Sequence, residues 1–267
     1  MVKTIACIPA AWKQIISVKS YLANFRFYEE LNDFLAPGCY KEILEYRFDG
    51  RPAIKDPIET LGVPHSEVDL ILVNDDSVGF DYRLQHGDRV AVYPMFESLD
   101  ISPLQHLRAK PLRVTRFMVD VNLGKLARLL RMLGFDTAYG NRLEDGEIVE
   151  IAIREKRIIL TRDRRLLFRR TVTHGFWVRS DDPETQLGEV MQRLDLAAQV
   201  NPLQRCLQCN GLIESVDREQ VWASLEPLTR RYYSEFYRCS SCHKVYWEGS
   251  HVEHMSDAIR QMLGPRR

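Results

Sequence analysis

The stretch RFMVDVNLGKLARLLRMLGFDT, residues 116–137, decides the fold of the middle of this chain. A short apolar run at 116–119 ends on Asp120, and apolar residues then recur every three or four positions over 123–133. The first pattern is typical of a buried strand and the second of an amphipathic helix. A fold needs these apolar residues but has no need of a carboxylate at the strand's end, so Asp120 is a candidate functional residue.

The alternation of strands and helices continues beyond this stretch. We expect strands near 137–139, 157–161 and 176–178, and helices near 146–155, 164–170 and 183–194. Strands separated by helices of roughly ten residues are typical of βαβ units, in which the strands run parallel and the helices cover the sheet. The middle of the chain is therefore predicted to be an α/β domain with a parallel sheet.

A second strand also ends on an aspartate, because RIILTRD, residues 157–163, places Asp163 just beyond its apolar run. The carboxyl ends of parallel strands border the ligand crevice of such sheets, so neighbouring strands would bring Asp120 and Asp163 together. Two close carboxylates repel each other unless a cation lies between them. Mg²⁺ and Mn²⁺ prefer oxygen ligands, and the pattern predicts a site for one of these ions.

Further acidic residues precede two of the expected helices. Asp145 in LEDGEIVEIA is either the N-cap of its helix or a third metal ligand, and the sequence leaves both open. Asp181 and Asp182 follow the last strand, where capping the helix that begins at Pro183 is the favoured interpretation.

Cations accompany the acidic residues. Lys125, Arg128 and Arg131 are three residues apart along one helix, and Arg162 lies beside Asp163. These side chains suit phosphate binding near a metal, although a solvated helix face explains the same spacing.

Two CxxC pairs, CLQCNG and CSSCHK, mark the end of the chain. They offer four thiolates, Cys206, Cys209, Cys239 and Cys242, which predict a closed tetrahedral zinc site. The long interval between the pairs implies an extended hairpin or an insertion. Its interleaved aromatic and basic residues suit either stacking on single-stranded RNA or a small core.

The first hundred residues read as a small mixed β domain. Short β-rich runs broken by turn signals include expected central strands at 68–73 and 89–93, and 55–61 is a candidate helix. Net charge is zero over 267 residues, so global charge indicates no partner. No apolar run approaches the roughly 18 residues of a membrane span, and we expect a soluble, cytoplasmic protein.

The chain from residue 113 to the end resembles the Mut-seven C-terminal ribonuclease family. The resemblance lies in FMVDVNLGKLARLLRMLGFDT, LTRD, the CxxC pairs and WEGSH. It implies a PIN-like α/β/α fold, a zinc ribbon and a metal-dependent nuclease site. By position, the acidic residues of the family match Asp120, Asp145 and Asp163, its basic motifs contain Arg128, Arg131 and Arg162, and its GSH element contains His251. His251 would contact RNA or pack the ribbon; Asp136, also in the motif, is interpreted as structural.

The N-terminal region resembles the ubiquitin-like β-grasp domain that precedes this nuclease in some bacterial proteins. LGVPHSEVDLILVN and HGDRVAVYP carry the resemblance. Because the chain runs on after VYP instead of ending on Gly-Gly, a docking or regulatory module with a protein partner is favoured over sulfur transfer.

Together these observations predict a multi-domain α/β protein. Its parts are a leader of uncertain structure at 1–22, a β-grasp domain at 23–99, a linker at 100–112, a PIN-like nuclease at 113–200 and a zinc ribbon at 201–267. The expected function is a ribonuclease with Mg or Mn at Asp120, Asp145 and Asp163 and structural Zn at the cysteines. Lys125, Arg128, Arg131, Arg162 and His251 would bind RNA. The alternatives are a catalytically silent RNA-binding or ribosome-associated factor, and a β-grasp interaction adaptor.

Overall fold

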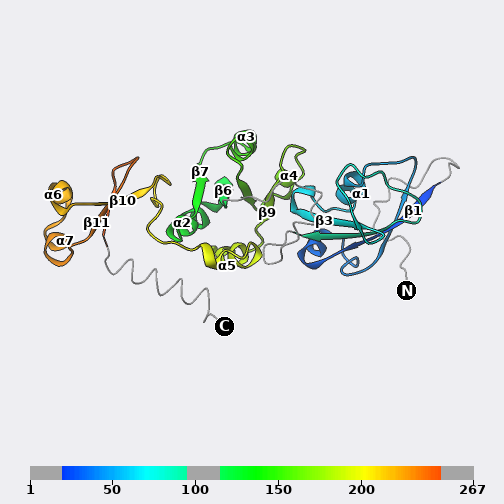
Figure 1. Ribbon diagram of the computed structural model, residues 1–267, viewed down its shortest axis with the longest axis horizontal. Coiled ribbons are helices and arrows are strands. Elements are labelled where there is room, and N and C mark those ends of the chain that lie inside the picture. Colours follow the sequence, from blue (N-terminus) through cyan, green and yellow to red (C-terminus); the bar gives the residue numbers. More distant parts are fainter. Residues whose placement is uncertain (1–19, 95–114, 248–267) are drawn as a thin grey trace. The chain divides into compact units, whose positions relative to one another are not determined.

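A computed structural model describes residues 20–94 and 115–247 (Figure 1). The chain divides into two compact units: Met1–Arg113 with Asp163–Phe176, and Val114–Arg162 with Trp177–Arg267. His251, the predicted linker and nearly all of the predicted leader lie outside the described residues. Within the described residues, no helix is long and apolar enough to cross a membrane.

The N-terminal domain is built on a five-stranded mixed sheet of order β2-β1-β5-β3-β4, in which β1 and β5 are parallel and the other pairs antiparallel. Its elements are β1 (Tyr21–Phe27), η2 (Glu29–Phe34), β2 (Leu44–Phe48), α1 (Lys55–Thr60), η3 (His65–Glu67), β3 (Val68–Val73), β4 (Asp76–Ser77) and β5 (Arg89–Pro94).

The apolar pattern of this domain predicted its interior. The expected strands at 68–73 and 89–93 are β3 and β5, both interior to the sheet, with β5 in the middle. The expected helix at 55–61 is α1. Phe25 and Phe27 alternate with exposed or half-buried neighbours along β1 and are fully buried with Ile58 of α1. This arrangement is β-grasp-like.

The central residues form a four-stranded sheet of order β7-β6-β8-β9, in which β6 is parallel to both β7 and β8. Its elements are β6 (Arg116–Val119), η4 (Val121–Leu123), α2 (Gly124–Met132), β7 (Asp136–Tyr139), α3 (Asp145–Glu155), β8 (Ile158–Thr161), α4 (Arg164–Leu167), β9 (Gly175–Trp177) and α5 (Pro183–Arg193). The predicted alternation and the parallel pairing of β6, β7 and β8 are confirmed.

Two helices differ from the expectation. The helix expected from 123 begins only at Gly124, after the 3-10 turn η4, and Gly124 packs so closely on Tyr139 that a Cβ would lie 2.6 Å from the tyrosine oxygen. The helix expected to reach residue 170 ends at Leu167, because Leu166 and Leu167 are its buried residues and the arginines beyond them are exposed.

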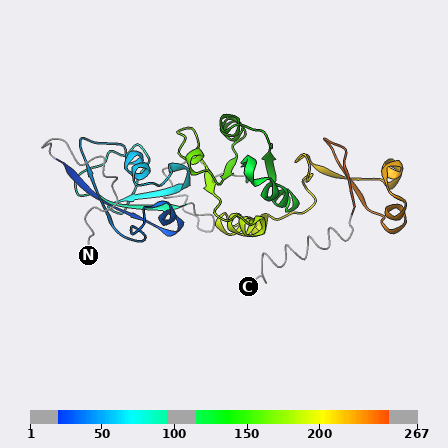
Figure 2. The same cartoon turned by 180° about the vertical axis from the view of Figure 1, so that it is seen from behind.

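The C-terminal module is an antiparallel sheet of order β10-β11-β12, with two short helices inserted between β10 and β11. Figures 1 and 2 show α6 and α7 side by side. Its core is Val221, Leu225 and Phe236, with Tyr233 and Trp247 packed against it. An insertion therefore occupies the interval between the cysteine pairs. The remaining elements are η5 (Ala197–Gln199), β10 (Ile213–Val216), α6 (Arg218–Val221), η6 (Trp222–Ser224), α7 (Pro227–Tyr232), β11 (Phe236–Cys239) and β12 (Val245–Trp247).

Candidate functional site

The four cysteines of the CxxC pairs lie together. The ligand atoms of Cys206, Cys209, Cys239 and Cys242 are all within 4.8 Å of one another. Sulfur to sulfur, Cys206 is 3.5 Å from Cys242, and Cys209 is 3.5 Å from Cys239. Among the described residues, no other group of three or more potential metal ligands has its ligand atoms this close together.

Both cysteine turns have the same backbone geometry. The N–H of Asn210 donates to the Cys206 carbonyl at 2.9 Å, and the N–H of His243 donates to the Cys239 carbonyl at 3.1 Å. Asn210 and His243 both have left-handed backbones, with φ of 68° and 60°. The N–H of the second cysteine of each pair also points at the first sulfur, at 3.5 Å. Four sulfurs with amide donors fit a closed, structural Zn²⁺ site.

Arg131 fixes the first cysteine turn to the central sheet. It is 5% exposed, and its Nε donates to the Thr137 carbonyl at 2.9 Å. Its Nη1 donates to the carbonyls of Leu207 at 3.3 Å and Gln208 at 3.0 Å, inside the turn. The predicted phosphate contact is thus replaced by a structural role, because burial and three carbonyl partners hold this guanidinium away from solvent.

Asp136, the first residue of β7, is a second link to the same turn. It accepts hydrogen bonds from Arg157 Nη1 at 2.6 Å, Asn210 Nδ2 at 2.8 Å and Arg205 Nη2 at 3.2 Å. Burial alone would raise the pKa of Asp136, but the hydrogen bonds from Arg157 and Asn210 outweigh burial and hold the pKa below its usual value. These contacts support the structural interpretation of Asp136, although it begins a strand.

Asp120 lies where the strand pattern placed it, one residue beyond the carboxyl end of β6. It is 5% exposed. Its N–H donates to the Leu160 carbonyl at 3.0 Å, and its Oδ2 accepts from Thr161 Oγ1 at 2.7 Å. The neighbouring strand β8 thus orients this carboxylate. Sequence reasoning missed Thr161, although a hydroxyl residue directly before the Arg162-Asp163 pair was a visible signal.

The other two aspartates are exposed at helix starts. Asp163 caps α4, with its Oδ1 accepting from the N–H of Arg165 at 2.8 Å. Asp145 is the first residue of α3, whereas the N-cap is Glu144, whose backbone N–H donates to Glu147 Oε2 at 2.8 Å as part of a capping box. The interpretation of Asp145 as an N-cap is therefore wrong by one residue, because the glutamate pair already satisfies the helix start.

Three of the predicted phosphate-binding residues are exposed and could contact a ligand. Lys125 and Arg128 are exposed on α2. Arg162 is also exposed, and it forms an ion pair with Asp181. Asp182 caps α5 as predicted: the Thr185 N–H donates to its Oδ2 at 2.8 Å and lowers its pKa, as does the charge of Lys125 to a smaller degree.

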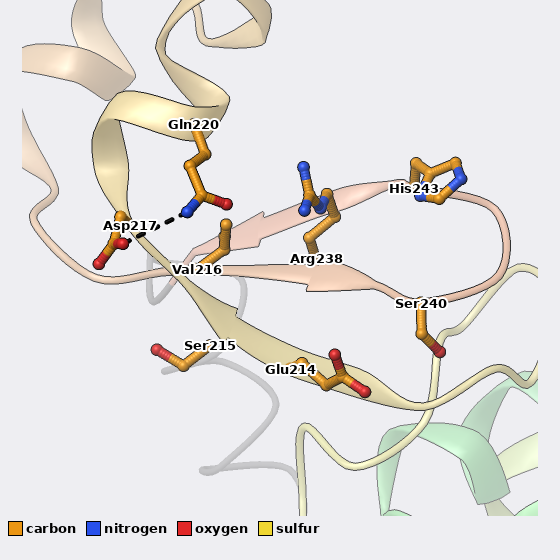
Figure 3. A pocket seen from close by; sticks show the side chains of 8 residues that line it. All are labelled: Glu214, Ser215, Val216, Asp217, Gln220, Arg238, Ser240 and His243. Atoms are coloured by element: carbon orange, nitrogen blue, oxygen red, sulfur yellow. Dashed lines mark hydrogen bonds between the residues drawn. The ribbon is translucent and has the colours of Figure 1, made fainter.

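A polar cavity of about 450 Å³ lies on the C-terminal module (Figure 3). Arg238 and Glu214 face each other across β11 and β10, and His243 extends from the turn after the second cysteine pair. At the far end, Gln220 Nε2 donates to Asp217 Oδ2 at 3.3 Å. Donors and acceptors of both charges suit a polar ligand such as a nucleotide.

The aromatic residues of this module divide between its two predicted roles. Phe236, Tyr233 and Trp247 form or cover the small core. Trp222 is 44% exposed, and the guanidiniums of Arg218 and Arg230 lie 4.7 and 5.1 Å from its ring centroid. Core packing is confirmed for the first group. Stacking on RNA stays a prediction for Tyr232, Tyr237 and Tyr246, and the surface around Trp222 is not part of that prediction.

Two family models match this chain. The Mut7-C ubiquitin model covers residues 20–100, and the Mut7-C RNAse domain model covers residues 115–259. No curated protein and no solved structure matches the chain. The RNAse domain model spans more than half of the sequence, including β6, Asp120 and all four cysteines. The chain therefore belongs to the Mut7-C RNAse domain family and carries a Mut7-C ubiquitin domain ahead of the nuclease region.

Proposed function

We propose that this protein is a metal-dependent ribonuclease that hydrolyses phosphodiester bonds of RNA. The observation that carries the proposal is the setting of Asp120, a nearly buried carboxylate at the carboxyl end of β6 that Thr161 of the parallel strand β8 orients. The match to the Mut7-C RNAse domain model supports a nuclease role for a carboxylate held there.

Asp120, Asp163 and Asp145 would hold Mg²⁺ or Mn²⁺. Thr161 engages Oδ2 of Asp120, and no described residue donates a hydrogen bond to Oδ1, which suits that oxygen for a hard cation. Asp163 follows β8, the strand beside β6, and its Oδ1 keeps its orientation through the Arg165 N–H. Such a cation supplies a water of lowered pKa and stabilises charge that develops on the phosphate.

The exposed cations of α2 would bind the RNA backbone. Within the described residues, Lys125 and Arg128 form no hydrogen bond or ion pair through their side chains, so a phosphate would not need to displace a partner. Arg162 would exchange Asp181 for a phosphate oxygen. The zinc site would be structural, since four cysteines complete a tetrahedral shell and leave no open position.

Cleavage assays with matched variants test this proposal. The zinc-loaded protein is incubated with single-stranded and structured RNAs in Mg²⁺, Mn²⁺ or EDTA. Asp120→Asn and Asp163→Asn keep the side-chain shape but remove the charge, and we expect cleavage to fall by orders of magnitude while RNA stays bound. Glu150→Gln, which removes an exposed carboxylate of α3, is the control and should cleave normally. Full activity of both aspartate variants would refute the metal site.

A silent RNA-binding factor is the second candidate, favoured by the polar cavity and by the arginines around Trp222 on the C-terminal module. The same assay separates the two. RNA that is retained but never cut, in any metal, would support the binding factor.

A further inference from the structure

The segment Asp163–Phe176 belongs by its contacts to the unit of the N-terminal domain, although in sequence it lies inside the nuclease region. It begins with the candidate metal ligand Asp163 and continues directly into α4, which packs against η3. A helix of one turn is not stable by itself and takes its stability from tertiary contacts. The contacts that hold α4 therefore also hold the backbone that carries Asp163.

The first contact is made by Arg164, the residue after Asp163. Its Nη2 donates to the Phe34 carbonyl at 2.9 Å and lies 3.5 Å from the Gly62 carbonyl. Its guanidinium also lies over the Phe34 ring, 4.9 Å from the centroid. Gly62 has φ of 106°, and a Cβ there would lie 2.9 Å from the Phe34 carbonyl oxygen, so a glycine is needed to bring the two carbonyls near one guanidinium.

The second contact lies at the other end of α4. Ser66 Oγ donates to the Leu167 carbonyl at 3.0 Å, and both residues are completely buried. Gly175 closes this contact, because a Cβ there would lie 2.4 Å from the Leu167 side chain and 3.3 Å from Ser66 Oγ. Because the Leu167 carbonyl at the C-terminal end of α4 is buried, it needs a hydrogen-bond donor such as the Ser66 hydroxyl.

We propose that the N-terminal domain is a clamp, formed by Phe34, Gly62 and Ser66, that fixes α4 and thereby sets the position of Asp163 for metal binding. The inference rests on the proposed function, because it assigns the domain a positioning role toward that metal site. It also differs from the alternative of a β-grasp interaction adaptor, in which the domain serves an outside partner.

The neighbouring arginines of α4 provide a matched test in the full-length, zinc-loaded protein. Arg164→Gln removes the guanidinium that the clamp binds. Arg165→Gln removes the same charge one residue later, where the exposed side chain forms no hydrogen bond or ion pair with described residues and only the backbone N–H contacts Asp163. Ser66→Ala removes the second contact without adding bulk.

The first measurement is hydrogen exchange of peptides from Asp163–Phe176. We expect exchange at least several-fold faster in Arg164→Gln and Ser66→Ala than in Arg165→Gln and the unaltered protein. Peptides of β1 should be unchanged in all four, which shows that the domain itself stays folded. Equal protection of the segment in all four proteins would overturn the clamp, whatever the enzyme does.

The second measurement is Mn²⁺ affinity, followed by electron paramagnetic resonance of the free ion. We expect Arg164→Gln to bind Mn²⁺ several-fold more weakly than Arg165→Gln, and its cleavage to recover as Mn²⁺ is raised. Matching Mn²⁺ affinities would overturn the positioning role even if exchange differs. If the unaltered protein binds no Mn²⁺ and cuts no RNA, the proposed function fails, and the exchange data alone then decide whether the clamp exists.

Discussion

At the scale of single residues, three charged side chains of α2 show how position in the fold changes the meaning of a motif. Lys125, Arg128 and Arg131 look equivalent in sequence, yet the first two are exposed and Arg131 is buried against three carbonyls. Two of those carbonyls are more than seventy residues away, at Leu207 and Gln208. A helical period shows that three cations lie on a common side, but it carries no information about which of them another module covers.

Replacing Arg131 by lysine should therefore affect zinc release, whereas replacing Arg128 by lysine should not. Arg131→Lys loses the planar donors that reach Thr137 and the first cysteine turn at once, so we expect zinc to leave a chelator-challenged protein faster. Arg128→Lys, at an exposed position of the same helix, should release zinc at the unaltered rate. A colorimetric zinc-release assay measures both, and equal rates would contradict the bridging role of Arg131.

Asp136 gives a prediction that depends on pH. Its folded pKa is lowered by Arg157 and Asn210 in spite of burial, whereas an unfolded aspartate titrates near pH 4. The stabilisation is therefore fully present above about pH 4 and is lost as the pH falls through the lower folded pKa. We expect Asp136→Asn to lower the free energy of unfolding by roughly 1–3 kcal/mol at pH 7.

Urea unfolding of the zinc-loaded protein, in buffers without added zinc and at several pH values, measures the free energy of unfolding and checks the Asp136 prediction. The difference between the unaltered protein and Asp136→Asn should shrink as the pH falls below about 4 and through the lower folded pKa of Asp136, where the native carboxyl becomes protonated too. A difference that stays constant across this range would assign the effect to packing instead of charge.

At the scale of elements, we expect the C-terminal module to depend on a zinc ion at its four cysteines more than on its apolar core. Among the described residues of this module, the buried apolar cluster consists of Val221, Leu225 and Phe236, which is small for three strands and two helices. Structural zinc sites contribute about 10–16 kcal/mol of apparent binding free energy in small modules. Chelation should consequently unfold β10, β11 and β12 while β1 and β5 keep their protection, as hydrogen exchange can measure. Retention of β11 protection in metal-free protein would contradict this dependence.

Element identity was largely predictable, because local apolar patterns encode it. Strand β6 and helix α3 follow from the period of their apolar residues, and the start of α5 at Pro183 follows from proline placement. The contacts of the site were less predictable. Thr161 orients Asp120 from another strand, Glu144 displaces Asp145 from the cap, and Arg164 faces Phe34, 130 residues earlier. Such pairings depend on tertiary packing, and a single sequence does not record them.

At the scale of the whole molecule, the zero net charge limits how RNA can be attracted. The proposed RNA binding would rest on a few local cations, and each phosphate contact to a single strand contributes about 0.7 to the slope of log affinity against log salt. We expect Lys125→Gln with Arg128→Gln to reduce that slope by about 1.4, whereas Arg165→Gln should leave it unchanged. Fluorescence anisotropy over a salt series measures the slope, and an unaltered slope in the double variant would place the RNA elsewhere.

The links from Arg131 and Asp136 to the first cysteine turn have a consequence for communication within the molecule. Without zinc, Asn210 and the carbonyls of Leu207 and Gln208 would lose their fixed places, and both the buried Arg131 of α2 and the half-buried Asp136 of β7 would lose partners. The stability of the central sheet would thus depend on a metal ion that the sheet does not contact. By thermodynamic reciprocity, if bound zinc raises the affinity for RNA along α2, RNA bound there must raise the affinity for zinc by the same factor, and it would then also protect the cysteines from oxidants.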